Sequence, residues 1–297
     1  MREALPAARP GSSELRGIAV TLVAMMLFSL MDAVSKYLSM RYPTPQILWL
    51  RYLFTVPLVL VALAPGGIVH RVRSAHPWLQ LLRSLLLVVE IGFVIWAFGR
   101  LPLADVQSVL ALTPLAVTAL SVPLLGEQVG ARRWAAVAMG LVGILIVLRP
   151  GLGVIQPATL AALAAVLLYA LYQILTRLVG RVDAAETSLL WQFVLGSIAL
   201  TAVAPFFWRT PEPVHWPLFV VAAVLGGSGH YAMIKALQLA PAVVVQPFSY
   251  TGLLWSVIIG YLVFGDLPDA PTLIGAGVIV AAGTYAAVRE HRLRRSF

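Results

Sequence analysis

Apolar runs of about twenty residues recur through this chain, and they restrict its fold more than any other feature. A helix rises about 1.5 Å per residue, so roughly 20 apolar residues are needed to cross the hydrocarbon layer of a membrane. Cutting the runs at their Pro, Gly and charged residues predicts ten such helices. They span residues 16–38, 45–64, 77–98, 103–124, 131–148, 157–178, 186–206, 215–237, 241–263 and 271–289. A composition of 60% hydrophobic and 11% charged residues supports an all-α integral membrane protein.

Positive charge is unevenly divided between the two sides of these predicted helices. Of the 21 Lys and Arg residues, 14 fall on the side of the N-terminus, four on the other side and three inside helices. Cytoplasmic loops collect Lys and Arg, so we expect cytoplasmic tails at 1–15 and 290–297 in a protein of the inner (cytoplasmic) membrane. The topology explains the net charge of +9, and no nucleic-acid partner is predicted.

The second half of the chain repeats the first. An offset of 139 residues pairs Pro102, Gln107, Gly126 and Glu127 with Pro241, Gln246, Gly265 and Asp266, and an offset of 141 pairs Asp32, Lys36 and Arg51 with Gln173, Arg177 and Gln192. We expect two five-helix units, at 16–151 and 152–289. Because five is odd, the second unit enters the membrane from the opposite side. Such inverted repeats are typical of secondary transporters with a site near the midplane.

Particular segments also resemble a known family. The segment "LTPLAVTALSVPLLGEQVGARRWAAVAMGLVGILIVLRPG", 112–151, has a helix with Pro, then Gly-Glu, a basic pair, Trp and Gly. It resembles the end of the five-helix unit in the EamA family of the drug/metabolite transporter superfamily. The second copy has Gly265-Asp266 but lacks the Trp and the basic pair. The resemblance implies two inverted halves around a central cavity, and usually export of amino acids or related metabolites.

Three charged side chains gather in the outer half of the first two predicted helices: Asp32, Lys36 and Arg51. A charge in mid-membrane costs on the order of 2.5–3.5 kcal/mol, so each needs an explanation. Lys36 can extend to the interface on its long stem. Asp32 is too short to do so, and its candidate partners are Lys36, one turn away, and Arg51. The cluster is predicted either to gate or contact a substrate or to form a static clamp.

Glu90 and His230 are the candidates for proton coupling. Glu90 lies near the middle of its predicted helix, where a carboxyl can carry a proton, bind a substrate amine or hydrogen-bond between helices. His230 can also take up a proton, or can simply pack. Arg83, nearer the cytoplasm, is expected to reach the interface, and Asp266 is expected at a solvated helix end.

The remaining candidates for substrate binding or gating are amide and aromatic side chains inside predicted helices. They are Gln107, Tyr169, Tyr172, Gln173, Gln192, Tyr231, Gln246, Tyr250 and Trp255. Such groups line pockets for small molecules, but each can equally pack between helices or against lipid.

Signatures of enzymes and of ATP-driven pumps are missing from the sequence. It has no cysteine, no HExxH or GxSxG motif and no Walker lysine. An intramembrane enzyme that uses Asp32 and Glu90 as a carboxyl pair is the alternative from another class, but these residues lie on different helices at different depths. We therefore predict a secondary transporter without cofactor or metal that exports small metabolites, foremost amino acids, with uptake and proton coupling as alternatives.

Overall fold

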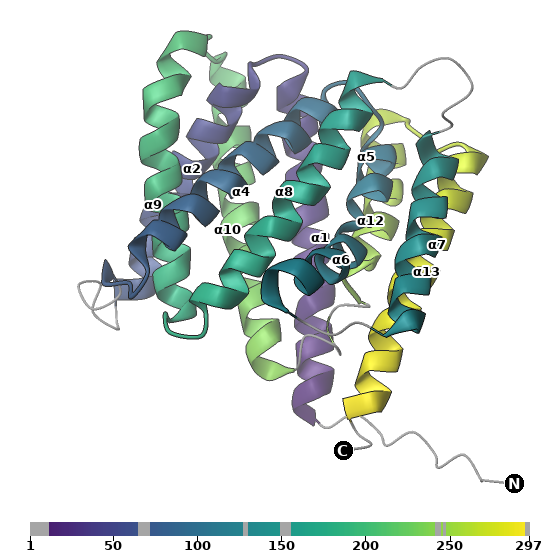
Figure 1. Cartoon of the computed structure of the whole chain (residues 1–297). Coiled ribbons are helices and arrows are strands. Elements are labelled where there is room, and N and C mark those ends of the chain that lie inside the picture. Colours follow the sequence, from purple (N-terminus) through teal and green to yellow (C-terminus); the bar gives the residue numbers. More distant parts are fainter. Residues whose placement is uncertain are drawn as a thin grey trace, which may run out of the picture.

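The computed structural model of the chain describes residues 12–64, 72–126, 130–148, 156–240, 245 and 248–294, and within these ranges all regular structure is helical (Figure 1). The first half contains α1 (Ser12–Ser39), α2 (Thr44–Leu63), α4 (Pro77–Phe98), α5 (Leu103–Leu110), α6 (Thr113–Leu125) and α7 (Ala131–Leu148). The second half contains α8 (Pro157–Val179), α9 (Ala185–Val203), η2 (Ala204–Phe207), η3 (Pro213–His215), α10 (Trp216–Leu239), α12 (Thr251–Ile259), η4 (Gly260–Phe264) and α13 (Ala270–Arg294). The prediction of an all-α membrane protein is confirmed.

The predicted helices agree closely with those observed. The predicted helix 103–124 is divided into α5 and α6 at Ala111 and Leu112, because Pro114 has no N–H to continue the hydrogen-bond ladder and occupies the first turn of α6. The predicted helix 241–263 is described mainly from residue 248, as α12 followed by the π-helical turn η4. Six helices of the described ranges are long and apolar enough to cross a membrane.

The two halves are inverted relative to each other. In Figure 1, α1 starts at the end of the bundle where α13 finishes, here called the terminal end, whereas α8 starts at the opposite, distal end. The helices pair as α1–α10, α4–α8, α2–α9, α5–α12 and α7–α13, so each pair joins one helix of either half. Exchanging the halves turns α1–α10 into α8–α4 and leaves α2–α9 and α7–α13 unchanged. The bundle therefore has the two-fold pseudo-symmetry of an inverted repeat.

Two glycines end equivalent helices in this repeat. Gly126 after α6 and Gly265 after η4 have φ angles of 66° and 70°, which are left-handed conformations that only glycine adopts at little cost. They are the residues that the offset of 139 pairs, so the repeat in the sequence corresponds to a repeated helix end.

Small residues let the helices approach closely around the centre of the bundle. A Cβ atom added to Gly226 would lie 2.8 Å from Met31 Sδ, and one added to Gly229 would lie 2.8 Å from the Phe28 ring. The run 226–230 therefore packs α10 onto α1, as small residues do between membrane helices. This close pairing sets the distance between α1 and α10, which carry Asp32 and His230.

Candidate functional site

Asp32 and Gln107 meet in the interior of the bundle. The Gln107 side-chain amide of α5 donates a hydrogen bond of 2.7 Å to Asp32 Oδ2 of α1. The structure thus brings together two residues that the sequence singled out separately. Pairing of Asp32 with Lys36, which their spacing suggested, is wrong: the carboxylate turns toward α5, and no ion pair joins these two residues.

Lys36 pairs with the second half of the chain instead. Its ammonium lies 2.5 Å from Asp266 Oδ2, donates a 3.1 Å hydrogen bond to the Leu101 carbonyl and stands 4.7 Å from the centre of the Phe264 ring. The turn at Gly265 brings Asp266 back over the end of η4, toward α1. Lys36 is only 6% exposed, so the expectation that it extends to the interface is wrong. Asp266 lies at a helix end with 32% of its side chain exposed, as expected, but its carboxylate is paired with Lys36.

Arg51 on α2 and Glu90 on α4 complete a buried charged cluster with Asp32. Arg51 is 4% exposed and Glu90 is 7% exposed. The guanidinium interacts electrostatically with Asp32, Glu90 and His230. Within the described ranges, however, neither the Arg51 guanidinium nor the Glu90 carboxyl has a hydrogen bond or an ion pair. The predicted pairing of Asp32 with Arg51 is therefore an interaction at longer range.

Aromatic rings of the second half face this cluster. Tyr169 and Tyr172 of α8 stack with centroids 5.6 Å apart and planes at 14°, and Tyr169 interacts electrostatically with Glu90. The Tyr172 hydroxyl donates a 2.8 Å hydrogen bond to the Gln192 amide oxygen of α9. Tyr52, next to Arg51, is fully buried with a hydroxyl that finds no partner in the described part of the chain. The site thus combines charges with flat rings.

His230 lies beside the site, and in the described part of the chain neither His230 nor Gln173 makes a side-chain hydrogen bond. The His230 ring stands edge-on to Phe28 and Phe193, with centroids 5.0 Å and 6.0 Å away. This environment favours a packing role for His230. Gln173 is half-buried on α8.

Three of the predicted site residues do not join the cluster, and a fourth cannot be placed. Tyr231 is 53% exposed on α10, with Lys235 Nζ 5.6 Å from its ring centre. The Tyr250 hydroxyl lies against α13, only 1.7 Å from where a Cβ of Gly283 would stand. Trp255 packs into the separate core around α5, α7 and α13. Gln246 lies outside the described residues.

A polar network at the terminal end was missed by the sequence interpretation. Arg83 is 1% exposed rather than at the interface, and it donates hydrogen bonds to Gln80 Oε1 (2.9 Å), to Thr176 Oγ1 (3.0 Å) and to the Ser188 carbonyl. Gln80 in turn donates 2.9 Å to Asp183 Oδ2. The signal in the sequence is that Gln80, Arg83 and Ser84 share one face of α4, which is polar where a lipid-facing surface would be apolar.

Asp183 anchors this network in the turn between α8 and α9. Burial alone would raise the pKa of its carboxyl. Hydrogen bonds from the Ser74 hydroxyl, the Ala75 amide and Gln80, together with nearby His76, outweigh burial and hold the pKa below its ordinary value. Asp183 therefore stays ionised and ties the segment before α4 to the second half.

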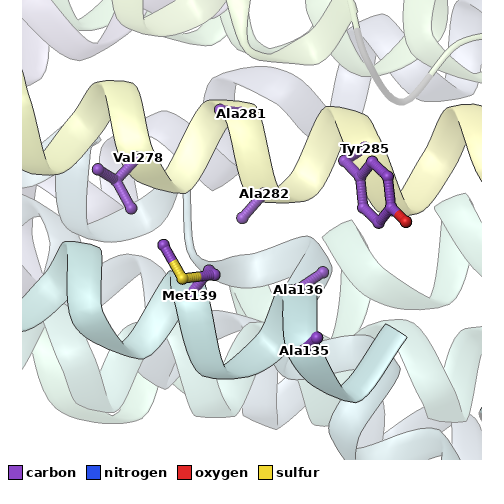
Figure 2. A pocket seen from close by; sticks show the side chains of 7 residues that line it. All are labelled: Ala135, Ala136, Met139, Val278, Ala281, Ala282 and Tyr285. Atoms are coloured by element: carbon purple, nitrogen blue, oxygen red, sulfur yellow. The ribbon is translucent and has the colours of Figure 1, made fainter. Parts of the chain in front are cut away.

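An apolar groove lies elsewhere, between α7 and α13. Figure 2 shows its lining, which includes Met139, Val278, Ala282 and Tyr285. Its volume is about 310 Å³, but its lining is apolar apart from one hydroxyl. It is a separate feature from the charged cluster.

An inverted repeat of membrane helices with charges buried between its halves defines a membrane transporter rather than an enzyme. The sequence matches the model of the EamA-like transporter family over residues 15–149 and again over 156–287, so the chain belongs to this family. The predicted family resemblance is confirmed.

Several characterised relatives are similar to nearly the whole chain. A riboflavin transporter of Vibrio cholerae is 28% identical, over 95% of this chain and 96% of the relative. An S-adenosylmethionine uptake transporter of Rickettsia prowazekii is 26% identical, over 94% of each. A pseudopaline exporter of Pseudomonas aeruginosa is 23% identical, over 90% of this chain and 94% of the relative. A crystal structure with a TM-score of 0.64 and 21% identity covers 93% of this chain and 98% of its own, and it shows the same fold.

Proposed function

We propose that this protein is a secondary transporter of the inner membrane, with cytoplasmic termini, that moves a small metabolite by alternating access between its two repeats. The observation that carries the proposal is the buried cluster of Asp32, Arg51 and Glu90 between helices of both halves. Charges this deep in a membrane protein are costly, and in transporters they mark the substrate pathway.

The partners of these charges favour a substrate that carries both an acidic and a basic group. Lys36 is occupied by Asp266, and Asp32 by Gln107. Arg51 is therefore the cation available for a substrate carboxylate, and Glu90 is the carboxyl available for a substrate amine. A zwitterion placed between them satisfies both, whereas an ion of one sign leaves the other group without a partner.

The stacked rings of Tyr169 and Tyr172, here called the ring wall, favour a substrate with a flat part. Tyr169 and Tyr172 present a stacked pair next to Glu90, and aromatic faces bind flat rings by offset stacking. Two of the relatives are named for riboflavin and for S-adenosylmethionine, which both contain fused aromatic rings. S-adenosylmethionine also contains an amino-acid head group. We propose a metabolite of this kind, an amino-acid head joined to a ring, as the substrate class.

Uptake is the direction that we propose first, because the relative named for S-adenosylmethionine is an uptake transporter. Export of amino acids, which the sequence favoured, is the second candidate. It is supported by the charged cluster, which suits any zwitterion, and by the similarity to a pseudopaline exporter.

Counterflow in proteoliposomes tests the proposal. Vesicles with the purified protein are loaded with unlabelled S-adenosylmethionine, riboflavin or an amino-acid mixture, and entry of the labelled compound is followed. We expect S-adenosylmethionine to exchange faster than in vesicles containing the control variant Arg51→Gln. Preferential exchange of amino acids would favour the second candidate, and no exchange of any compound would contradict the proposed function. Reversing the gradient then identifies the direction in which transport accumulates substrate.

A further inference from the structure

Arg83 has an unusual position for an arginine near a membrane surface. It lies less than two turns from the start of α4 at Pro77, yet its side chain is among the largest fully buried ones of the described chain. Its hydrogen bonds to Thr176 and to the Ser188 carbonyl join a helix of the first half to α8 and α9 of the second.

One of the Arg83 contacts leads directly into the proposed substrate site. Arg83 Nη1 lies 3.4 Å from the Tyr172 hydroxyl, and the guanidinium carbon lies 5.2 Å from the centre of the same ring. A phenol has one proton, and Tyr172 donates it to Gln192. The hydroxyl oxygen therefore accepts from Arg83. Tyr172 is thus held by its hydroxyl from two sides, and the same Arg83 guanidinium also lies near its ring.

Helix packing alone does not explain this arginine. In the part of the chain that the structure describes, no carboxylate lies within ion-pair distance of the Arg83 guanidinium, whose hydrogen-bond acceptors are neutral. Burying a guanidinium without a counter-charge is costly, and an apolar side chain would join the helices at a lower cost. The fixed orientation of Tyr172 is a feature that requires the several N–H donors of the Arg83 guanidinium.

We propose that Arg83 is a positioning residue for substrate binding: it fixes the plane of the Tyr172 ring, and with it the stacked Tyr169–Tyr172 pair that the flat part of the substrate contacts. The inference rests on the proposed function and deepens it, because it assigns ring specificity to a residue outside the site. Gln80 accepts a hydrogen bond from Arg83 and is itself bound to Asp183, so the support of the Tyr172 ring extends to the terminal end.

Equilibrium binding to the purified full-length protein tests the inference without transport. The probes are S-adenosylmethionine and riboflavin, which contain rings, and methionine, which does not. The variants are Arg83→Met, Tyr172→Phe and both together. We expect each single variant to raise the dissociation constants of the ring-containing probes by roughly fivefold, as for loss of one hydrogen bond. The double variant should be no weaker than either single one, because both changes break the same contact. Methionine binding should not change.

A matched control and the unfolding midpoint separate positioning from stability. Arg100→Met removes an exposed arginine 3.8 Å from the Trp96 ring, far from the site, and should bind like the wild type. Arg83→Lys should have an unfolding midpoint between those of Arg83→Met and the wild type, but its affinity for the ring-containing probes should stay as low as that of Arg83→Met. Two results overturn the inference and leave the proposed function standing. In one, the variants lose stability while their dissociation constants stay at the wild-type value. In the other, the dissociation constants of all three probes rise equally. If the wild type binds none of the probes, both are overturned.

Discussion

The two walls of the proposed site come from equivalent helices, yet their chemistry is opposite. The first half supplies charges: Asp32 on α1, Arg51 on α2 and Glu90 on α4. The second half supplies the stacked tyrosines of α8 and the Gln192 amide of α9. The repeat pairs Asp32 with Gln173 and Arg51 with Gln192, so each of these charged residues has an uncharged counterpart in the second half.

This difference shows that a symmetric scaffold can bind an asymmetric molecule. The repeat supplies helices that pair across the halves, and each half contributes one helix to each pair. Binding groups need not be shared, because a metabolite with a charged head and a flat ring needs one wall of each kind. Replacing residues of one wall by their counterparts in the other tests how far this division carries function.

The strongest way to break the division is Arg51→Gln, which gives the charged wall the residue of its counterpart Gln192. We expect transport to fall by about a hundredfold, because the substrate carboxylate loses its buried partner. Initial rates of S-adenosylmethionine counterflow measure the loss. Arg41→Gln changes an exposed arginine at the distal end and serves as the control. Activity within threefold of the wild type would mean that Arg51 is not the anchor of the acidic group.

Asp32→Asn should have the next largest effect. It removes the charge but keeps the size of the group that Gln107 contacts, and we expect a loss of about tenfold in transport, the value of one charged hydrogen bond. Lys36→Gln should lower transport less, because Lys36 is bound to Asp266 outside the cluster. The opposite order would indicate that the charges of α1 form a static structural clamp rather than a substrate contact.

Glu90→Gln tests whether the charged wall also carries protons. We expect the pH profile of transport to flatten in this variant, since the Glu90 carboxyl has no partner among the described residues that would keep it in one state. His230→Gln should keep the wild-type profile, because the imidazole is packed between two phenylalanines. Rates measured between pH 5 and pH 9, with and without an ionophore, give the comparison. Unchanged profiles in both variants would exclude these residues as proton carriers.

Asp183→Asn should have the smallest effect, on the support of the ring wall. The folded state holds the pKa of Asp183 below the unfolded value of about 3.9, so its carboxylate stabilises the fold above that value. This contribution is lost as the pH falls through the folded pKa. At pH 7 we expect the unfolding midpoint of the variant to be about 2 °C lower, and the difference should shrink as the pH falls through the folded pKa. Glu212→Gln, an exposed acid at the other end, is the control, and a difference independent of pH would argue against this role.

Much of the fold could be predicted because the membrane leaves few choices. Hydropathy locates helices when every backbone group must be satisfied within its own segment. The inverted repeat was readable from matching positions such as Gly126 and Gly265, whose conformation only glycine supplies cheaply. The division of the fourth helix at Pro114 was not predicted, because proline kinks depend on the packing of the neighbouring helices.

Side-chain partners could be predicted less well than helices. The pairing of Lys36 with Asp266 joins residues 230 positions apart, so the local spacing that suggested Asp32 was misleading. Arg83 was placed at the interface because long basic side chains near helix ends usually extend there. Its burial depends on acceptors in α8 and α9, which only the tertiary structure brings to it. Candidates such as Tyr231 face away from the site, because composition does not reveal the direction in which a helix is rotated.

The Glu90 carboxyl, which has no hydrogen bond or ion pair among the described residues, also has an electrical consequence. A zwitterion bound between Arg51 and Glu90 adds no net charge. Its transport without a proton therefore generates no current and is not driven by the membrane voltage. A cycle in which Glu90 releases one proton moves one elementary charge, worth about 2.3 kcal/mol at 100 mV. At about 1.4 kcal/mol per tenfold, that voltage alone sustains a substrate gradient of roughly fiftyfold. For a substrate without net charge, such a proton cycle at Glu90 would decide whether the protein equilibrates its substrate or concentrates it.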